Sequence, residues 1–365
     1  MQHLQPKTTL QGGKYRIERV LGQGGFGITY LATQLSLQRQ VAIKEFFMKD
    51  FCSRDEVTQT MSTPSTGSRS LVELYRKKFI KEARNLARLN HPHIISVIDV
   101  FEENDTVYYV MPYLSGGSLL DYVKTHGALS ENEAMKYVKQ IASALKYMHE
   151  EEHICHYDVK PANILLDEKG NAILIDFGIS KHYDDHGKGT TMTPVGLSEG
   201  YAPIEQYQQQ VNIFSPASDV YALGATLYYL LHGKTPVNAP MRAGGASLPI
   251  KNAMSPYTKR LLNVSMKVST SERAKSMDVF LDDGTMIFGG EESATHASER
   301  TVTMGLNQGN TFYTSSAGSH NYAFRNILII LCIILAVALG VYIVNQYQSN
   351  KVPIEKASYS DYFDR

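Results

Sequence analysis

The stretch His156-Tyr157-Asp158-Val159-Lys160-Pro161-Ala162-Asn163 is the most informative part of this sequence. It brings a carboxylate, an ammonium group and a carboxamide close together in the chain, and the triplet Asp176-Phe177-Gly178 soon adds a second carboxylate. Taken singly, each group has a structural explanation, since Asp158 could be a turn residue and Asn163 a cap. Such explanations give no reason for an acid, an ammonium group and two oxygen ligands of the metal-binding kind to occur in this order.

A glycine-rich turn lies near the N-terminus, between two segments that alternate as strands do. Gly22-Gln23-Gly24-Gly25-Phe26-Gly27 separates Tyr15 to Leu21 from Ile28 to Leu31. Glycine lacks the Cβ that would keep backbone amides away from a phosphate, although such a pattern alone is a weak indicator of nucleotide binding. The next predicted strand, Val41 to Lys44, places an ammonium group under the same turn.

Patterns typical of strands come first in the chain, and helical patterns come later. Leu71 to Leu89 has a helical period, with Glu82 beside its apolar stripe, and it follows a polar stretch, Ser53 to Ser70, that we interpret as an inserted loop. Ser130 and Glu133 form a capping box that predicts the start of a second long helix. Further strands are predicted at 94–101, 107–111 and 172–175, and a helix buried on most sides is predicted at 219–232.

These motifs, in this order, resemble those of the eukaryotic-like (Hanks-type) serine/threonine protein kinases. The later segment Gly200-Tyr201-Ala202-Pro203-Ile204-Glu205-Gln206 is similar to the bacterial, membrane-anchored branch of that family. The resemblance covers residues 15–282 and implies an α+β fold with two lobes. The N-terminal lobe, an antiparallel sheet, would span about 15–111, and the mainly helical lobe would span about 115–282.

The resemblance implies ATP-dependent phosphorylation of serine or threonine hydroxyls on protein substrates, with ATP and Mg²⁺ as cofactors. Asp158 would act as the catalytic base toward the substrate hydroxyl, and Lys160 would steady the γ-phosphate. Asp176 and Asn163 would each bind Mg²⁺. Phosphoryl transfer needs little covalent help, because the enzyme mainly holds the γ-phosphate in line with the hydroxyl and offsets the charge on its oxygens.

The remaining residues of the implied site would bind ATP. Lys44 would hold the α and β phosphates, and Glu82 would fix Lys44 by pairing with it. The adenine would hydrogen-bond to the carbonyl of Pro112 and the amide of Leu114, next to Met111 as gatekeeper. The full set that we expect to bind ATP is Leu21, Gly22, Gly24, Gly25, Gly27, Thr29, Ala42, Lys44, Glu82, Met111, Pro112, Leu114 and Leu165.

The resemblance also implies supporting roles. Asp219 would brace the backbone of the catalytic loop, His156 to Asn163. Ser198 keeps a hydroxyl that could bond to Asp158 and Lys160. Glu205 and Arg273 would form a buried ion pair in the larger lobe. An apolar column through Val97, Leu86, Phe177 and His156 would link the two lobes.

The sequence departs from the family pattern at several places, among them Ser198, which stands where the family usually has threonine. Tyr157 stands where the family usually has arginine, so we hypothesise that activity does not depend on a phosphate docking beside Asp158. Thr29 replaces the usual valine above the adenine, and its methyl group can still pack there. The spacing between Lys44 and Glu82 is longer than the family norm, which leaves regulation and docking both open for the 53–70 insertion.

The composition of the chain argues against nucleic acid as a partner and against stabilisation by zinc or disulfides. The chain has 365 residues, 43% of them hydrophobic, and its 36 Lys and Arg balance its 36 Asp and Glu. A formal net charge of zero makes a broad basic surface unlikely, so we expect no nucleic-acid partner. The three cysteines are far apart, which implies neither a disulfide framework nor a structural zinc site.

One segment stands outside the globular average. Ile327 to Val344 is 18 uncharged and almost wholly apolar residues, about 27 Å long as a helix, which matches a bilayer core. A buried core helix is the alternative, although such helices usually carry a polar stripe. We predict a flexible tether at 283–325, a transmembrane helix at 326–345 and a short tail at 346–365.

The expected location is therefore the cell membrane, crossed once, with the kinase domain in the cytosol because it needs ATP and has no visible signal peptide. The charges that flank the span favour the opposite orientation by one residue. The main alternative function is a nucleotide-binding pseudokinase that acts as a scaffold at the membrane. A receptor is disfavoured because only 21 residues, Asn345 to Arg365, follow the apolar run, and a homodimer for autophosphorylation is left open.

Overall fold

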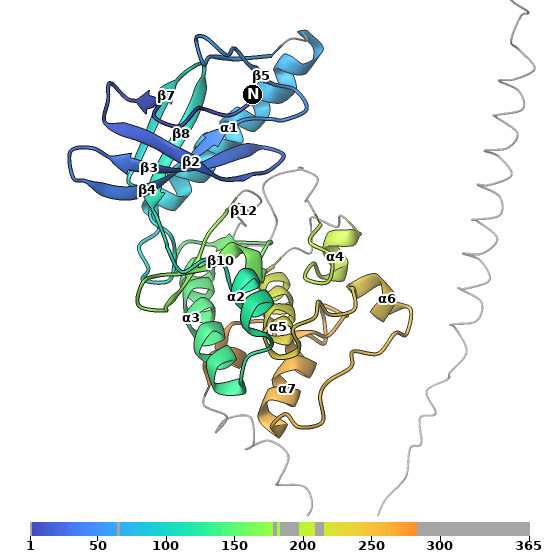
Figure 1. Cartoon of the computed structure of the whole chain (residues 1–365). Helices are drawn as coiled ribbons and strands as arrows, with labels where there is room; N and C mark the ends of the chain where they lie inside the picture. The colour runs from blue at the N-terminus through green and yellow to red at the C-terminus, as the bar shows by residue number, and fades with distance from the viewer. Residues whose placement is uncertain (1, 64–65, 178–180, 183–196, 209–214, 283–365) are drawn as a thin grey trace, which may run out of the picture. The chain divides into compact units, whose positions relative to one another are not determined.

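The computed structural model describes residues 2–63, 66–177, 181–182, 197–208 and 215–282. All of these lie in one compact unit, Met1–His296. They form two lobes, one built on a sheet and the other mainly helical (Figure 1), as the motifs predict. Within these ranges no helix is long and apolar enough to cross a membrane. The predicted tether, transmembrane helix and tail lie outside the described residues.

The N-terminal lobe is a six-stranded antiparallel sheet in the order β1-β2-β3-β4-β8-β7. Helix α1 (Thr66–Arg88) packs against this sheet through Phe79, whose ring lies beside those of Phe46 and Tyr109. The alternation of buried residues that predicted the strands is present in β2, where Tyr15 and Ile17 are fully buried. The strands are β1 (Thr9–Leu10), β2 (Tyr15–Gln23), β3 (Gly27–Gln34), β4 (Arg39–Phe46), β7 (Asp99–Glu103) and β8 (Thr106–Pro112).

The prediction of a plain inserted loop at 53–70 was wrong. The insertion contains a small hairpin of β5 (Ser53–Arg54) and β6 (Met61–Ser62), and α1 begins five residues before the predicted Leu71. Asp55 closes the hairpin turn, because its Oδ1 accepts hydrogen bonds from the amides of Val57 and Thr58. Two-residue strands give no recognisable alternation, so periodicity could not detect this hairpin.

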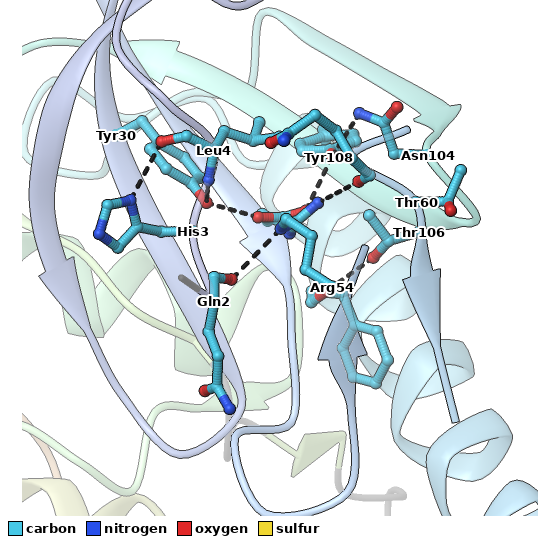
Figure 2. A network of polar contacts seen from close by, with 12 residues as sticks. Gln2, His3, Leu4, Tyr30, Arg54, Thr60, Asn104, Thr106 and Tyr108 are labelled. Carbon is cyan, nitrogen blue, oxygen red and sulfur yellow. Dashed lines mark hydrogen bonds and ion pairs between the residues drawn. The ribbon is translucent and has the colours of Figure 1, made fainter. Parts of the chain in front are cut away.

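Arg54 of this hairpin enters the core of the N-terminal lobe (Figure 2). Its Nη2 lies 2.5 Å from Glu45 Oε1, and Glu45 also accepts hydrogen bonds from the hydroxyls of Tyr30 (2.6 Å) and Tyr108 (2.7 Å). Arg54 further donates to the carbonyl of Gln2. Both charged side chains are completely buried, so the paired charges and the tyrosine hydroxyls offset each other's loss of water.

Residues 2–14 thus belong to the N-terminal lobe, although their sequence gave no sign of it. Leu4 and Leu10 are buried in the same apolar cluster as the sheet. The amide of Leu4 donates to the Tyr30 hydroxyl, and the amide of Lys7 donates to the carbonyl of Ile17. This terminal segment therefore adds one short strand and two apolar anchors to the lobe.

The C-terminal lobe is centred on α5 (Pro216–His232), which is buried on nearly all sides as predicted. Helix α3 (Glu131–Glu150) packs beside it and begins at the predicted cap, where Ser130 Oγ accepts a hydrogen bond from the amide of Glu133. Gly224 allows α5 to pack closely against α7, because a Cβ there would lie 2.4 Å from Ser265 Oγ. The other helices are α2 (Leu119–His126), α4 (Ile204–Tyr207), α6 (Ala239–Ala243), α7 (Pro256–Ser265) and α8 (Asp278–Leu281).

Short strands line the side of this lobe that faces the sheet. They form two antiparallel pairs: β10 (Ile164–Leu166) with β11 (Ala172–Leu174), and β9 (Ile154–Cys155) with β12 (Lys181–His182). A 3₁₀ turn, Pro161–Asn163, leads into β10. The predicted column between the lobes is present in part: Val97 packs against both apolar cores, and the rings of Phe177 and His156 lie 4.7 Å apart.

Candidate active site

The glycine-rich turn is held over the end of β4. The amide of Gly24 donates to the carbonyl of Gly27 (2.9 Å), and the amides of Phe47 and Lys49 donate to the carbonyls of Phe26 and Gly25. Only glycine fits at position 27, because a Cβ there would lie 2.8 Å from the carbonyl oxygen of Glu45 and 3.8 Å from Lys44 Cε. The turn thus lies directly above Lys44. A Cβ at Gly22 or Gly25 would meet no atom within 4 Å, which leaves those positions open.

Lys44 joins three elements of the structure. Its Nζ lies 3.1 Å from Glu82 Oε1 on α1 and 2.9 Å from Asp176 Oδ1 at the end of β11. Burial alone would lower the pKa of Lys44, but the carboxylates of Asp176 and Glu82 outweigh it and raise that pKa well above its ordinary value. In turn, Lys44 lowers the pKa of Asp176. Lys44 and Asp176 therefore keep their charges at neutral pH. The predicted Lys44–Glu82 pair is present.

The catalytic loop gathers four of the expected side chains. Lys160 Nζ donates to Asp158 Oδ2 (2.7 Å) and to Ser198 Oγ (2.9 Å), and Ser198 Oγ donates to Asp158 Oδ1 (2.5 Å). Asn163 Nδ2 donates to the same oxygen as Lys160, 2.9 Å from Asp158 Oδ2. The carboxylate of Asp158 is thereby oriented by three donors, and only 16% of its side chain is exposed.

Asp219 of α5 holds the backbone of the catalytic loop by hydrogen bonds, as expected. Its carboxylate accepts hydrogen bonds from the amides of His156 (2.8 Å) and Tyr157 (2.7 Å), and it also bonds to His149 Nε2. Gln206 contributes from α4 by donating to the carbonyl of Tyr157. These contacts stabilise the left-handed backbone of Tyr157, where φ is +64°. His149 was missed in the sequence because no motif marks it. Gln206 lies in the motif Gly200 to Gln206, but that motif did not indicate its contact with the loop.

The residues expected around the adenine lie on both lobes. The sheet register sets Ala42 opposite Met111, and β8 ends at Pro112, where the chain leaves the sheet. Leu114 is partly exposed just beyond it. Leu165 lies on β10, which is tied to this connection by the amide of Gly116 donating to the carbonyl of Leu166. Leu21 and Thr29 lie on β2 and β3, and both remain accessible to solvent.

The residues present fit a magnesium ion. The amide of Ile175 donates to the carbonyl of Asn163 (2.9 Å), so the predicted ligands Asn163 and Asp176 come from adjoining backbone segments. The side-chain nitrogen of Asn163, Nδ2, already donates hydrogen bonds to Asp158. The side-chain oxygen of Asn163 is therefore left as a metal ligand. Nearly half of the Asp176 side chain is exposed. Carboxylate and carboxamide oxygens are the hard ligands that Mg²⁺ prefers.

Two further interactions involve buried polar side chains, and only the first of them was predicted. Glu205 and Arg273 form the predicted buried pair, with Arg273 Nη1 2.7 Å from Glu205 Oε1 and less than 2% of either side chain exposed. Tyr109 was not expected to contribute, yet its hydroxyl donates to Glu82 Oε1 at 2.9 Å. The available signal was a pair of adjacent tyrosines, Tyr108 and Tyr109, in a predicted strand, since a buried hydroxyl needs a partner.

Several known proteins are similar to this chain in sequence. The family described as "Protein kinase domain" matches residues 15–282. Serine/threonine-protein kinase PrkC of Bacillus subtilis (strain 168) is 33% identical over 250 residues, which are 68% of this chain and 35% of PrkC. Serine/threonine-protein kinase SIK2 of Gallus gallus is 35% identical over 231 residues, which are 63% of this chain and 26% of SIK2.

A solved structure, "PpkA-294 apo form", has a TM-score of 0.64 and 26% identity, and the match covers 77% of this chain and all of that one. The alignments span about a third of PrkC and about a quarter of SIK2, so this chain is similar to only part of each relative. Residues 15–282 of this chain contain every group placed above, from the glycine-rich turn to Arg273. With the family match covering most of its length, this chain belongs to the protein kinase domain family.

Proposed function

We propose that this protein transfers the γ-phosphate of ATP to serine or threonine hydroxyls of other proteins. The observation that carries the proposal is that Lys44 is paired with both Glu82 and Asp176, while Asp158 is oriented by Lys160 and Ser198. The paired Lys44 is suited to binding phosphate, and the oriented Asp158 is suited to binding a substrate hydroxyl. The names of two similar proteins, both serine/threonine-protein kinases, support the choice of acceptor.

Each residue has a distinct task in this proposal. Asp158 accepts a hydrogen bond from the substrate hydroxyl and takes its proton as the oxygen bonds to the γ-phosphorus. The bond from that phosphorus to the oxygen bridging it to the β-phosphate breaks, and ADP is the leaving group. Lys160 neutralises charge on the γ-phosphate, and Lys44 binds the α and β phosphates beneath the glycine-rich turn. Asn163 and Asp176 would hold Mg²⁺, which offsets charge on the phosphate oxygens when bound.

The adenine end of ATP is assigned to the junction of the lobes. The carbonyl of Pro112 and the amide of Leu114 bind the edge of the adenine. Met111, as gatekeeper, closes the inner side of the adenine site. Leu21, Ala42 and the methyl group of Thr29 cover the ring from the sheet, and Leu165 covers it from β10. This assignment uses Pro112 only as an acceptor, which proline can be.

A nucleotide-binding pseudokinase scaffold is the disfavoured alternative. Such a protein has no need to keep an oriented acid, whereas Asp158 here is held by Ser198, Lys160 and Asn163. The two metal-binding candidates are retained as well.

We also propose that the kinase domain is anchored in the cell membrane. The support is the apolar run Ile327 to Val344, joined through a tether at 283–325, with the domain in the cytosol where ATP is available. The full chain should stay with membranes after carbonate washing, and residues 1–282 should not. Recovery of the full chain in the wash would contradict the anchor.

Anchoring two copies in one membrane would favour a homodimer that phosphorylates itself, because it raises their local concentration. Wild-type chain mixed with an Asp158→Asn chain of different tag length tests this proposal. Label on the inactive chain is expected, and label confined to the active chain would contradict phosphorylation between copies.

The activity is tested with residues 1–282, Mg-ATP labelled on the γ-phosphate, and a generic serine/threonine substrate. Transfer is expected for the wild type and should be lost in Asp176→Asn, which keeps the size of the side chain and removes its charge. Nucleotide binding without transfer in both proteins would overturn the proposal in favour of the scaffold.

A further inference from the structure

Tyr109 lies beside the ion pair that holds Lys44. Strand β8 places Tyr109 opposite Lys44 of β4 in the sheet register, so both side chains leave the same face. The Tyr109 hydroxyl donates to Glu82 Oε1 at 2.9 Å, and Lys44 Nζ lies 3.1 Å from that same oxygen. One carboxylate oxygen of α1 is therefore shared by a cation and a phenol.

Tyr109 is packed closely by its neighbours. Only 1% of the residue is exposed, its ring lies 5.0 Å from that of Phe79 on α1, and Lys44 Nζ is 5.6 Å from its ring centroid. Burial, followed by the charge of Glu82, raises the pKa of Tyr109 well above its ordinary value, so the hydroxyl stays protonated and donates. A buried carboxylate such as Glu82 depends on donors of this kind for its stability.

The hydrogen bond matters because Lys44 divides its interactions. Its distance to Asp176 Oδ1 (2.9 Å) is shorter than its distance to Glu82 Oε1 (3.1 Å). The two carboxylates thus compete for one ammonium group. Because Tyr109 donates to Glu82, it favours the arrangement in which α1 stays against the sheet and Lys44 bridges the lobes.

We propose that Tyr109 is a positioning residue that holds Glu82, and through it Lys44, in the arrangement that binds the phosphates of ATP. The inference rests on the proposed function, since it concerns the same nucleotide site. Loss of the hydroxyl lowers the population of that arrangement in the free protein. Apparent ATP affinity falls by the same fraction, whereas turnover at saturating ATP is preserved, because bound ATP restores the arrangement.

The neighbouring tyrosine supplies a matched control. Tyr108 is equally buried on β8, and its hydroxyl also donates to a buried carboxylate, that of Glu45 at 2.7 Å. That bond belongs to the Arg54 cluster, which consists of Arg54, Glu45, Tyr30 and Tyr108. The cluster lies on the other face of the strand, and the bond touches no group placed in the site. Tyr108→Phe and Tyr109→Phe are therefore the same chemical change, one residue apart, on opposite faces of the sheet.

The experiment measures Mg-ATP binding by titration calorimetry, together with kcat and the KM for ATP, using the full chain in one detergent. We expect Tyr109→Phe to raise Kd and KM about tenfold with kcat within about twofold. Tyr108→Phe should leave Kd, KM and kcat within about twofold of the wild type and lower only the melting temperature. In a Glu82→Gln background, Tyr109→Phe should change Kd by less than about twofold, because its charged partner is gone.

An unchanged Kd for Tyr109→Phe would overturn the inference, and so would a loss of kcat at unchanged KM, which indicates a merely structural role. An undiminished effect in the Glu82→Gln background would overturn it as well. The proposed function fails separately: a wild type that binds Mg-ATP with the expected difference between variants but transfers no phosphate supports the role of Tyr109 and overturns the kinase activity. A wild type that does not bind Mg-ATP overturns both.

Discussion

Ser198 and Asp158 are hydrogen-bonded at 2.5 Å, although 40 residues separate them in the chain. The bond forms because the backbone turns sharply after Ser198, where the amides of Tyr201 and Ala202 both donate to its carbonyl. Gly200 permits this turn, since its φ is +81° and a Cβ would lie 2.3 Å from Thr235 Cγ2. The segment that follows the catalytic loop thus reaches back to orient its acid.

Loss of the Ser198 hydroxyl is expected to impair the chemical step. Ser198→Ala should lower kcat about tenfold, because a hydrogen bond to a charged group is removed from Asp158. Ser198→Thr keeps the hydroxyl and should retain most of the activity. Steady-state kinetics at saturating Mg-ATP distinguish the two variants, and equal loss in both would contradict the role of the hydroxyl.

The Glu205–Arg273 pair is expected to matter for stability rather than chemistry. Arg273→Ala leaves Glu205 buried without its partner and should lower the free energy of unfolding by about 3–5 kcal/mol. Urea unfolding measures this change. Lys267→Ala is the control, because Lys267 pairs with Glu272 at 3.9 Å while both are about half exposed or more. A similar effect for the two variants would contradict the special cost of the buried site.

The Arg54–Glu45 pair gives a second stability prediction, for the N-terminal lobe. Arg54→Ala should lower the free energy of unfolding by about 3–5 kcal/mol, since the Glu45 charge keeps only its tyrosine donors. Replacing both charges, with Arg54→Met and Glu45→Gln, should restore a large part of that loss. Urea unfolding of the single and double variants tests the coupling, which additive effects would refute.

Activity is expected to be largely independent of phosphorylation at Thr190, Thr191 and Thr193, which lie outside the described residues. The position that would receive such a phosphate is Tyr157, a buried side chain without a guanidinium group. Replacing all three threonines by alanine should change kcat by no more than about threefold. A loss of a thousandfold, measured with the same substrate, would show that a phosphate is required.

The sequence predicted the contacts of the candidate active site better than it predicted the core contacts of the N-terminal lobe. The pairing of Lys44 with Glu82 and the bracing of the catalytic loop by Asp219 follow motifs of fixed order, and the structure contains both. The anchoring of Leu4 and the entry of Arg54 into the core depend on contacts between distant segments. Local periodicity holds no information on such contacts, so they could be seen only in the folded chain.

Tyr109 illustrates the same limit inside the site. Its strand was predicted, but which face each residue of β8 presents depends on the register with β4. That register sends Tyr108 to the Arg54 cluster and Tyr109 to Glu82. The two roles differ although the residues are identical and adjacent.

The central claim is that Asp158 takes part in the transfer of phosphate and not in the binding of ATP. A single-turnover assay with γ-labelled Mg-ATP, run on wild type and Asp158→Asn beside a calorimetric measurement of Mg-ATP affinity, tests it most directly. We predict that transfer falls by at least about a hundredfold while affinity stays within about twofold. Transfer by the variant at the wild-type rate would contradict the claim.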